Sequence, residues 1–471
     1  MSLREHAGVA VPGTILIVGG GGREHALAWR LARDPGVAHV VVAPGNPGMT
    51  ADALLAPDVL ASDGLAVVAL ALAIEADLVV IGPEAPLVAG LADRLRAAGV
   101  AAFGPSAAAA RIEASKAFCR EVAHAAGVQI ADGAAFTDAI AAVLYAQGLD
   151  GPVVVKADGL AAGKGVVMCG TLDDARRAIR AVLIERAFGA AGDRVVVERA
   201  LEGQEVSVIA ICDATTALAL PAARDHKRIG EGDVGPNTGG MGAISPPADL
   251  PDTALATLVR TFHRPVLAEL AERGSPFRGA LFAGLMLTAR GPRLLEFNAR
   301  FGDPETQAIL PRLGVPLAPL LLAAAEDRLA EVAAGLGIVD GCVPAVERAT
   351  AAVVLAAPGY PEAPVTGAPI RGLDAGAVRS PDVLVFHAGV ADDGAGGLVT
   401  AGGRVMAVVG LGPDVPGAAA VAQTAASEVT FPGIQWRRDI GTAPAADGTS
   451  VGASEETRLV PAGAAPAGTA R

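Results

Sequence analysis

The sequence predicts an α/β protein with several domains, and three observations lead to this class. Residues 14–43 and 76–106 each alternate short apolar strands with helical patterns, which is typical of a doubly wound parallel sheet. Residues 136–200 follow the order strand, loop, strand, helix, strand around a glycine-rich loop. Short strand patterns recur from residue 349 to residue 441, as in a small α+β domain. The 471 residues exceed what one hydrophobic core organises, so about three domains are expected.

These patterns divide the chain into an N-terminal domain of residues 14–114, a central domain of residues 115–340 and a C-terminal domain of residues 341–441. The segment 136–200 is expected to form a lid-like subdomain inserted in the central domain. The tail, residues 442–471, is rich in Ala, Gly, Pro and Thr without periodicity, which predicts disorder.

The composition indicates a globular protein whose interior is built from Ala, Val and Leu, because 52% of residues are apolar but only 3% are aromatic. The net charge is −13 and no long basic run occurs, so binding to nucleic acid or to an anionic membrane is not expected. An acidic protein that binds small anions must concentrate its positive charge locally.

The cysteines and the apolar runs indicate a cytoplasmic protein without a membrane span. The longest apolar run, residues 65–74, is too short to cross a bilayer, and residues 1–13 lack the apolar core of a signal peptide. No C-x-x-C spacing occurs, which argues against a metal cluster or a disulfide framework and suits a reducing compartment. The four thiols are Cys119, Cys169, Cys212 and Cys342.

Residues 19–22 form a glycine turn between a strand and a helix. A dinucleotide-binding G-x-G-x-x-G motif is excluded, because Glu24 and His25 stand where its third glycine falls and no acid follows the second strand. The turn could hold a phosphate on the helix N-terminus, or it could simply be tight. Glu84 lies just beyond the strand that ends at residue 81, so it could face the same site.

The stretch KADGLAAGKGVV, residues 156–167, places two lysines around a glycine loop. It is not a Walker A motif, because three residues separate the first glycine from Gly-Lys and a strand follows instead of a helix. Lys156 follows three valines, and a lysine that ends a buried strand needs an anion. The stretch therefore favours a lid over nucleotide phosphates, with an exposed surface loop as the alternative.

The strand LLEFNAR, residues 294–300, carries Glu296, Asn298 and Arg300 on one face, and residues 295, 297 and 299 on the other. A carboxylate and an amide oxygen two residues apart suit Mg²⁺ held together with substrate phosphates, and Arg300 could hold a carboxylate or phosphate. A solvated polar face fits the pattern equally well.

Two further stretches are rich in charge or glycine. In FGDPETQ, Asp303 is expected to cap a helix that has Pro304 at its first position and Glu305 at its positive end, so these residues have a structural explanation. Residues 224–247, RDHKRIGEGDVGPNTGGMGAISPP, are expected to form a long loop that is either functional or a solvated turn.

Taken together, these stretches resemble one family, the phosphoribosylamine–glycine ligases, which are ATP-grasp enzymes of purine biosynthesis. The matching pieces occur in family order over residues 14–440, and RFGDPETQ and GPNTGGMGA are particular to this ligase family. The resemblance implies an N-terminal Rossmann-like domain, an ATP-grasp fold with its lid subdomain and a small C-terminal α+β domain.

The resemblance also implies a reaction. ATP, glycine and 5-phosphoribosylamine would give glycinamide ribonucleotide, ADP and phosphate through a glycyl phosphate, with Mg²⁺ or Mn²⁺. The partners would be these small molecules, with no nucleic acid and no membrane, and the protein would be a monomer. No protein nucleophile is needed, so catalysis would rest on positioning and charge neutralisation.

The resemblance assigns roles to residues that match the family's motifs. Arg300 and Asp225 would orient glycine or the acyl phosphate, and Glu296 and Asn298 would hold the metal. ATP would contact Lys116, Lys156, Gly159, Gly163, Lys164, Gly165, Glu198, Ala200, Leu201 and Glu205. Phosphoribosylamine would be surrounded by Gly21, Gly22, Arg23, Glu24, Glu84, Thr238, Gly239 and Gly240.

The chain departs from the family pattern at three places. Gly20 stands where many relatives have Asn or Ser, and the adenine-binding connector is Glu-Arg-Ala-Leu where relatives often have Glu-Glu-Phe-Leu. Residues 282–286 offer no carboxylate for a second metal. The alternatives are another ATP-grasp carboxylate–amine ligase, an NAD-dependent oxidoreductase and a nucleotide-binding protein without chemistry.

Overall fold

The computed structural model describes residues 9–161 and 165–442. The N-terminal domain is a parallel sheet in the order β3-β2-β1-β4-β5. Its central strands are runs of Val, Ile and Leu that are buried on both faces, as parallel sheets require. The elements are β1 (Thr14–Gly19), α1 (Gly22–Leu31), β2 (His39–Pro44), β3 (Leu54–Leu55), α2 (Gly64–Ala73), β4 (Leu78–Ile81), α3 (Glu84–Val88), α4 (Leu91–Ala97) and β5 (Ala102–Phe103).

The lid subdomain is an antiparallel sheet in the order β6-β9-β7-β8, joined to the N-terminal domain by helices α5 (Ala107–Ala114) and α6 (Lys116–Ala125). The predicted order omitted one helix, α7, which Asp138 caps by accepting a bond from the amide of Ala141 at 2.7 Å. Its elements are β6 (Gly133–Phe136), α7 (Ala139–Gly148), β7 (Val153–Ala157), β8 (Val166–Cys169), α8 (Leu172–Leu183) and β9 (Val195–Arg199).

The central sheet runs in the order β11-β10-β16-β17, and α9, α10 and α12 pack against it, whereas α11 packs against the C-terminal sheet. The predicted hairpin between β16 and β17 is present, but a bulge at Leu295 interrupts its register, since Gly284 pairs with Glu296 and Leu285 with Leu294. The elements are β10 (Gln204–Cys212), β11 (Ala217–Ala219), α9 (Asp252–Leu258), α10 (Arg264–Glu272), β16 (Gly279–Thr288), β17 (Gly291–Asn298), α11 (Glu305–Ile309), α12 (Ala318–Ala325) and α13 (Leu329–Gly335).

The C-terminal sheet runs in the order β12-β15-β18-β22-β19, so its first two strands come from the segment 224–247. That segment was expected to be a loop, because its strands are too short and too glycine-rich to show a period of two. The elements are β12 (Arg224–Asp225), β13 (Arg228–Gly230), β14 (Val234–Asn237), β15 (Gly242–Ser245), β18 (Ala349–Ala356), β19 (Val383–His387), β20 (Val390–Asp392), β21 (Leu398–Thr400), β22 (Arg404–Gly412) and α14 (Val415–Glu428).

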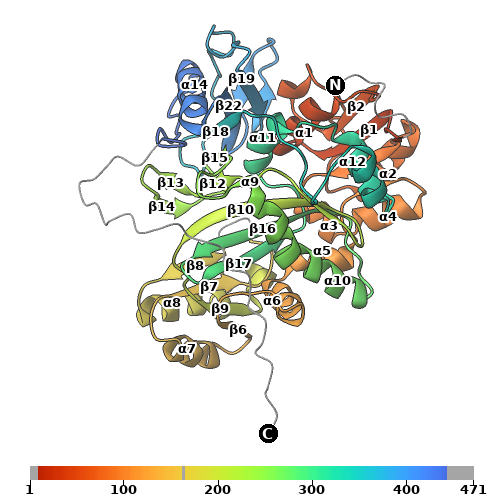
Figure 1. Ribbon diagram of the computed structural model, residues 1–471. Coiled ribbons are helices and arrows are strands. Elements are labelled where there is room, and N and C mark those ends of the chain that lie inside the picture. The colour runs from red at the N-terminus through yellow and green to blue at the C-terminus, as the bar shows by residue number, and fades with distance from the viewer. Residues whose placement is uncertain (1–8, 162–164, 443–471) are drawn as a thin grey trace.

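One hydrophobic cluster joins the three parts of the chain, because it contains Ile15 of β1, Ile209 of β10 and Val409 of β22. Figure 1 shows the C-terminal domain beside α1 of the N-terminal domain, and the lid subdomain at the opposite end of the central sheet. Of the helices in residues 9–161 and 165–442, each is too short or too polar to cross a bilayer. The tail from residue 443, predicted to be disordered, lies outside the described residues.

The buried His263 predicts an acid sensitivity of the central domain. Its Nε2 lies 3.2 Å from the carbonyl oxygens of Val208 and Leu281, and burial lowers the pKa of the ring to about 4. Below pH 6.5 the unfolded chain takes up a proton that the folded chain refuses, so stability falls between pH 6.5 and pH 4, by up to about 3 kcal/mol. Urea unfolding should show a smaller loss from pH 8 to pH 5 in His263→Leu than in the unmodified protein, and an equal loss would contradict this assignment.

Candidate active site

Glu296 lies where the lid subdomain meets the central sheet. Lys156, at the end of β7, donates from Nζ to the carbonyl oxygen of Leu295 at 3.1 Å. Leu295 directly precedes Glu296 in the chain and is the extra residue of the bulge in β17. The lid lysine and the acidic face of residues 296–300 therefore share one site. Gly163 and Lys164, also predicted to contact phosphates, lie outside the described residues.

The Glu296 carboxyl is held as an anion. Burial alone would raise its pKa, but Lys227, Lys116 and Lys156 outweigh burial, and the pKa is lowered from its ordinary value. Three lysines from different elements therefore converge on one carboxylate. Two of them, Lys116 and Lys156, were predicted to bind nucleotide phosphates, whereas Lys227 was not among the predicted site residues.

The oxygens of Glu296 and Asn298 fit a hard divalent cation, because an ionised carboxylate and an amide two residues apart lie on one face of β17. Among residues 9–161 and 165–442, no group of three or more His, Cys, Asp or Glu side chains could hold a metal by itself. A cation here would complete its coordination with substrate phosphates and water, which is how Mg²⁺ binds in most nucleotide sites.

Glu198 and Glu205 are both engaged by cations. Glu198 is buried; its Oε2 lies 2.6 Å from Lys156 Nζ and its Oε1 2.6 Å from Arg120 Nη1. Its carboxylate is therefore occupied by Lys156 and Arg120. Glu205 Oε2 lies 2.5 Å from Lys227 Nζ, and the side chain remains partly exposed.

The other residues predicted to contact the nucleotide stand close to Lys156 or Glu198 in the sequence. In the connector after β9, the amide of Ala200 donates to the carbonyl oxygen of Pro152 at 3.0 Å, and Leu201 is half-buried. Gly159 follows β7, and its amide donates to Ala191 at 3.1 Å. The carbonyl oxygen of Gly165 accepts from Ala157 at 2.8 Å, which closes the base of the β7–β8 hairpin.

Arg300 links the carboxyl end of β4 to the end of β17. Its Nη2 lies 3.2 Å from Glu113 Oε1, and its Nε lies 3.5 Å from Glu84 Oε2. Burial works to raise the pKa of Glu84, but Arg300 overcomes it and lowers that pKa. At Glu113 burial wins and the pKa is raised. The sequence predicted that Glu84 and Arg300 line the site, but it offered no signal for Glu113, which sits within a helix.

The glycine turn, residues 19–22, is held by a side chain of α1, the helix that follows it. Glu24 accepts a bond from the amide of Gly21 at 2.7 Å and another from Arg23 Nε at 2.6 Å, while Arg23 Nη1 reaches the carbonyl of Phe301 at 3.2 Å. Arg23 and Glu24 are both buried. Gly22 opens α1. The turn therefore lies beside the end of β17, as a shared site requires.

The segment after β14 reaches the same region. Thr238 accepts a bond from the amide of Gly240 at 3.0 Å, and the carbonyl oxygen of Gly239 accepts from Arg404 Nη1 at 2.6 Å. Arg404 Nη2 also donates to Asp303 at 2.8 Å. The prediction that Asp303 caps a helix is wrong, because α11 begins at Glu305 with Pro304 as its cap. Asp303 instead binds the C-terminal domain through Arg404.

Asp225 lies against Gly240, where a Cβ atom would come within 2.7 Å of its Oδ1. That oxygen is buried and has no hydrogen-bond partner in the described part of the chain. Burial, followed by the nearby Glu305, raises the pKa of Asp225 well above its ordinary value. Glu305 is itself held by Ser207, whose Oγ donates to Oε1 at 2.9 Å. Burial therefore favours the protonated form of Asp225.

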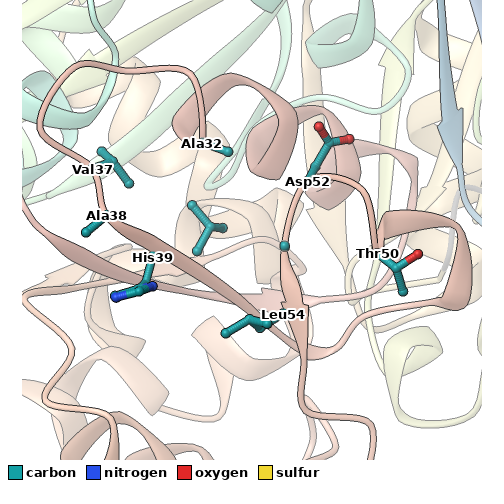
Figure 2. A pocket seen from close by; sticks show the side chains of 9 residues that line it. Ala32, Val37, Ala38, His39, Thr50, Asp52 and Leu54 are labelled. Atoms are coloured by element: carbon teal, nitrogen blue, oxygen red, sulfur yellow. The ribbon is translucent and has the colours of Figure 1, made fainter.

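Two surface hollows lie away from this cluster. One, of about 210 Å³, lies between the end of α1 and the starts of β2 and β3, and Figure 2 shows its lining, which includes Ala32, His39 and Asp52. The other, of about 290 Å³, lies between α7 and the start of α8. Neither includes a predicted site residue, and the first opens at the amino ends of parallel strands, opposite the edge where ligands usually bind.

Family models match nearly all of the described chain. Residues 13–113 match the N domain of phosphoribosylglycinamide synthetase, residues 114–306 its ATP-grasp (A) domain and residues 350–443 its C domain. The chain is 47% identical over 428 residues to the phosphoribosylamine–glycine ligase of Caulobacter vibrioides, covering 91% of this chain and 97% of that protein. It is 46% identical to the ligase of Mesorhizobium japonicum, with the same coverage of both chains.

Solved structures agree with this likeness. The structure of the Thermotoga maritima phosphoribosylamine–glycine ligase matches with a TM-score of 0.75 and 31% identity, covering 90% of this chain and 99% of that one. The biotin carboxylase domain of Hydrogenobacter thermophilus 2-oxoglutarate carboxylase, solved with MgADP, ADP and bicarbonate, matches with a TM-score of 0.68 at 18% identity over 91% of this chain and 92% of that one. This second likeness shows the ATP-grasp fold alone. The chain belongs to the phosphoribosylglycinamide synthetase family.

Proposed function

We propose that this protein joins glycine to 5-phosphoribosylamine with ATP, giving glycinamide ribonucleotide, ADP and phosphate in purine biosynthesis. The observation that carries the proposal is the convergence of Lys116, Lys156 and Lys227 on the ionised Glu296. Such a cluster can hold a nucleotide polyphosphate and a divalent cation together. The family and its named relatives supply the identity of the acid and the amine.

The reaction proceeds in two substitutions. An oxygen of the glycine carboxylate attacks the γ-phosphorus of ATP, the bond to the β-phosphate breaks, and glycyl phosphate and ADP form. The amine nitrogen of phosphoribosylamine then attacks the glycyl carbonyl carbon, phosphate leaves, and the amine releases a proton. Since no protein group becomes covalently bound, the side chains act by positioning the reactants and stabilising charge.

The proposed residue roles follow the geometry. Lys116 and Lys156 contact the polyphosphate, Glu296 and Asn298 hold Mg²⁺ or Mn²⁺, and Arg300 orients the glycine carboxylate. A divalent cation supplies charge neutralisation at the transferred phosphoryl group. Asp225, whose pKa is raised by burial, lies beside Gly240 where the acyl phosphate and the amine would meet.

Phosphoribosylamine is proposed to bind at the glycine turn, between Gly21, Glu84 and the Thr238–Gly240 segment. Arg23, Arg300 and Arg404 supply positive charge around Asp303 in this region, as the lowered pKa of that buried carboxyl indicates. We propose that the enzyme acts as a cytoplasmic monomer on small molecules alone, without nucleic acid or membrane. The net charge of −13 and the absence of any C-x-x-C spacing support these assignments. The proposed domain boundaries remain 14–114, 115–340 and 341–441.

The test is the substrate dependence of ADP release. With Mg²⁺, glycine and freshly generated phosphoribosylamine together, ADP should form in equal amount to glycinamide ribonucleotide, and omission of any one component should reduce the rate to background. Replacement of glycine by alanine or serine, and of the amine by ammonia, tests the wider class of carboxylate–amine ligases. ADP release at full rate without glycine would overturn the substrate assignment.

A further inference from the structure

We propose that Asp158 is a positioning residue for the nucleotide polyphosphate, because it fixes Lys116 on α6 relative to Lys156 on β7. The inference rests on the proposed function, which supplies the polyphosphate. Asp158 directly follows β7 and stands two residues after Lys156, and it belongs to none of the residue sets assigned above. Its contacts lead to the first turn of α6, which begins at Lys116.

Asp158 satisfies the start of α6. Its Oδ1 accepts from the amide of Ala117 at 2.7 Å and from Ser115 Oγ at 2.9 Å, and its backbone oxygen accepts from the amide of Lys116 at 3.0 Å. Ser115 Oγ accepts from the amide of Phe118 at 3.1 Å. The first three amides of α6, which helices leave unpaired, are therefore all taken. The helix can serve a phosphate only through the side chain of Lys116, whose backbone position Asp158 sets.

Asp158 is itself fixed within the lid subdomain. Its amide donates to the carbonyl oxygen of Arg194 at 3.1 Å, and the next amide, of Gly159, donates to that of Ala191 at 3.1 Å. Arg194 Nε also lies 3.8 Å from Asp158 Oδ2. These partners lie just before β9, so Asp158 ties the end of β7 to the neighbouring strand and to α6 at once.

A second connection fixes the side-chain ammonium group of Lys156. Arg120, one turn further along α6, donates from Nη2 to the carbonyl oxygen of Gly133 at 2.7 Å and pairs through Nη1 with Glu198. Glu198 pairs in turn with Lys156 Nζ at 2.6 Å. The helix therefore reaches the backbone of Lys156 through Asp158 and its ammonium group through Glu198. Loss of the carboxylate bonds to Ser115 and Ala117 should let the first turn of α6, with Lys116, shift while Lys156 stays in place.

The proposal predicts that Asp158 affects the binding of a nucleotide that has phosphates but not the binding of the nucleoside. Asp158→Ala should weaken binding of Mg-ADP about tenfold and raise the KM for ATP by a similar factor, while binding of adenosine and the KM for glycine stay unchanged, because only the phosphate contacts lose their alignment. Asp158→Asn, which keeps one acceptor oxygen for Ala117 and Ser115, should recover most of the affinity. Calorimetric titration of each variant with Mg-ADP and with adenosine provides the measurement.

Asp138→Ala is the matched control, because Asp138 caps α7 of the same subdomain with one carboxylate bond of 2.7 Å but lies outside the site. It should lose a similar amount of thermal stability and bind Mg-ADP normally. Unchanged Mg-ADP binding in Asp158→Ala, or equal losses for Mg-ADP and adenosine, would overturn the positioning role. If the unmodified protein binds Mg-ADP but forms no glycinamide ribonucleotide, the proposed ligase function fails while the role of Asp158 still holds.

Discussion

Replacement of Glu296 by Gln should reduce kcat by about a thousandfold or more without unfolding the protein. The carboxylate is the only acidic group of the predicted metal pair, and Lys227, Lys116 and Lys156 all act on it. Its removal leaves a neutral amide that holds a divalent cation poorly. The fold should survive, because Lys227 keeps its pair with Glu205 and Lys156 its pair with Glu198. ADP release with all three substrates, together with a thermal melt, gives the measurement.

Glu269→Gln provides the control for the Glu296 variant. Glu269 is a carboxylate on α10 that pairs with Arg273 at 2.7 Å, four residues along the same helix. A surface pair of this kind contributes roughly 0.3–0.5 kcal/mol, so its loss should leave turnover unchanged. A Glu296→Gln enzyme that turns over within about threefold of the unmodified one would remove Glu296 from the catalytic site, given the size of effect expected for a metal ligand.

Replacement of Arg300 by Met should both unfold the protein more easily and stop catalysis. Arg300 stands between Glu113, which is buried, and Glu84. Without the guanidinium, Glu113 is an unpaired buried acid, a defect that typically costs about 3–5 kcal/mol. Since the pKa of Glu113 is already raised by burial, the destabilisation should be largest at pH 7 and shrink as the pH falls and Glu113 takes up a proton. Urea unfolding at pH 7 and pH 5 measures both the size and the sign.

A second substitution separates the structural part of this effect from the catalytic part. Glu113→Gln removes the charge that Arg300 neutralises, while its amide oxygen can still accept the bond from Ala299 that the carboxylate accepts at 2.7 Å. The double variant should regain most of the stability lost in Arg300→Met and still lack turnover. If turnover returned with stability, Arg300 would be a structural residue only.

Much of the fold was predictable because its elements carry local signals. The N-terminal strands are apolar runs, and α6 and α8 begin after Ser115 and Thr171, residue types that are common helix N-caps. Lys156 and Glu296 were each predicted as site residues from their own sequence patterns, and Lys156 donates to the carbonyl oxygen of Leu295, the residue before Glu296. In each case the residue's own neighbours in sequence contain the information.

The wrong or missing predictions concern features that lack such a local sequence signal. The helix α7 is Ala139–Gly148, a stretch in which Ala, Leu and Val show little amphipathic period, so it was missed. Asp303 is of a residue type common at helix N-caps, but its side chain binds Arg404, about a hundred residues away in the sequence. Lys227 and Glu113 join the site through contacts with residues distant in the sequence, among them Glu205 and Arg300. Such long-range pairs leave no mark in the local pattern, and a single sequence cannot reveal them.

The position of strands β12 and β15 limits which segments of this enzyme can be exchanged with a homologue. They extend the C-terminal sheet, where Figure 1 shows β15 beside β18, and Arg404 of β22 donates to the carbonyl oxygen of Gly239, which lies between β14 and β15. A hybrid that takes the residues after about 350 from a homologue would contain a C-terminal sheet whose strands come from two different proteins. Segment 224–247 and the C-terminal domain should therefore be exchanged together, although residues 248–340 separate them in the chain.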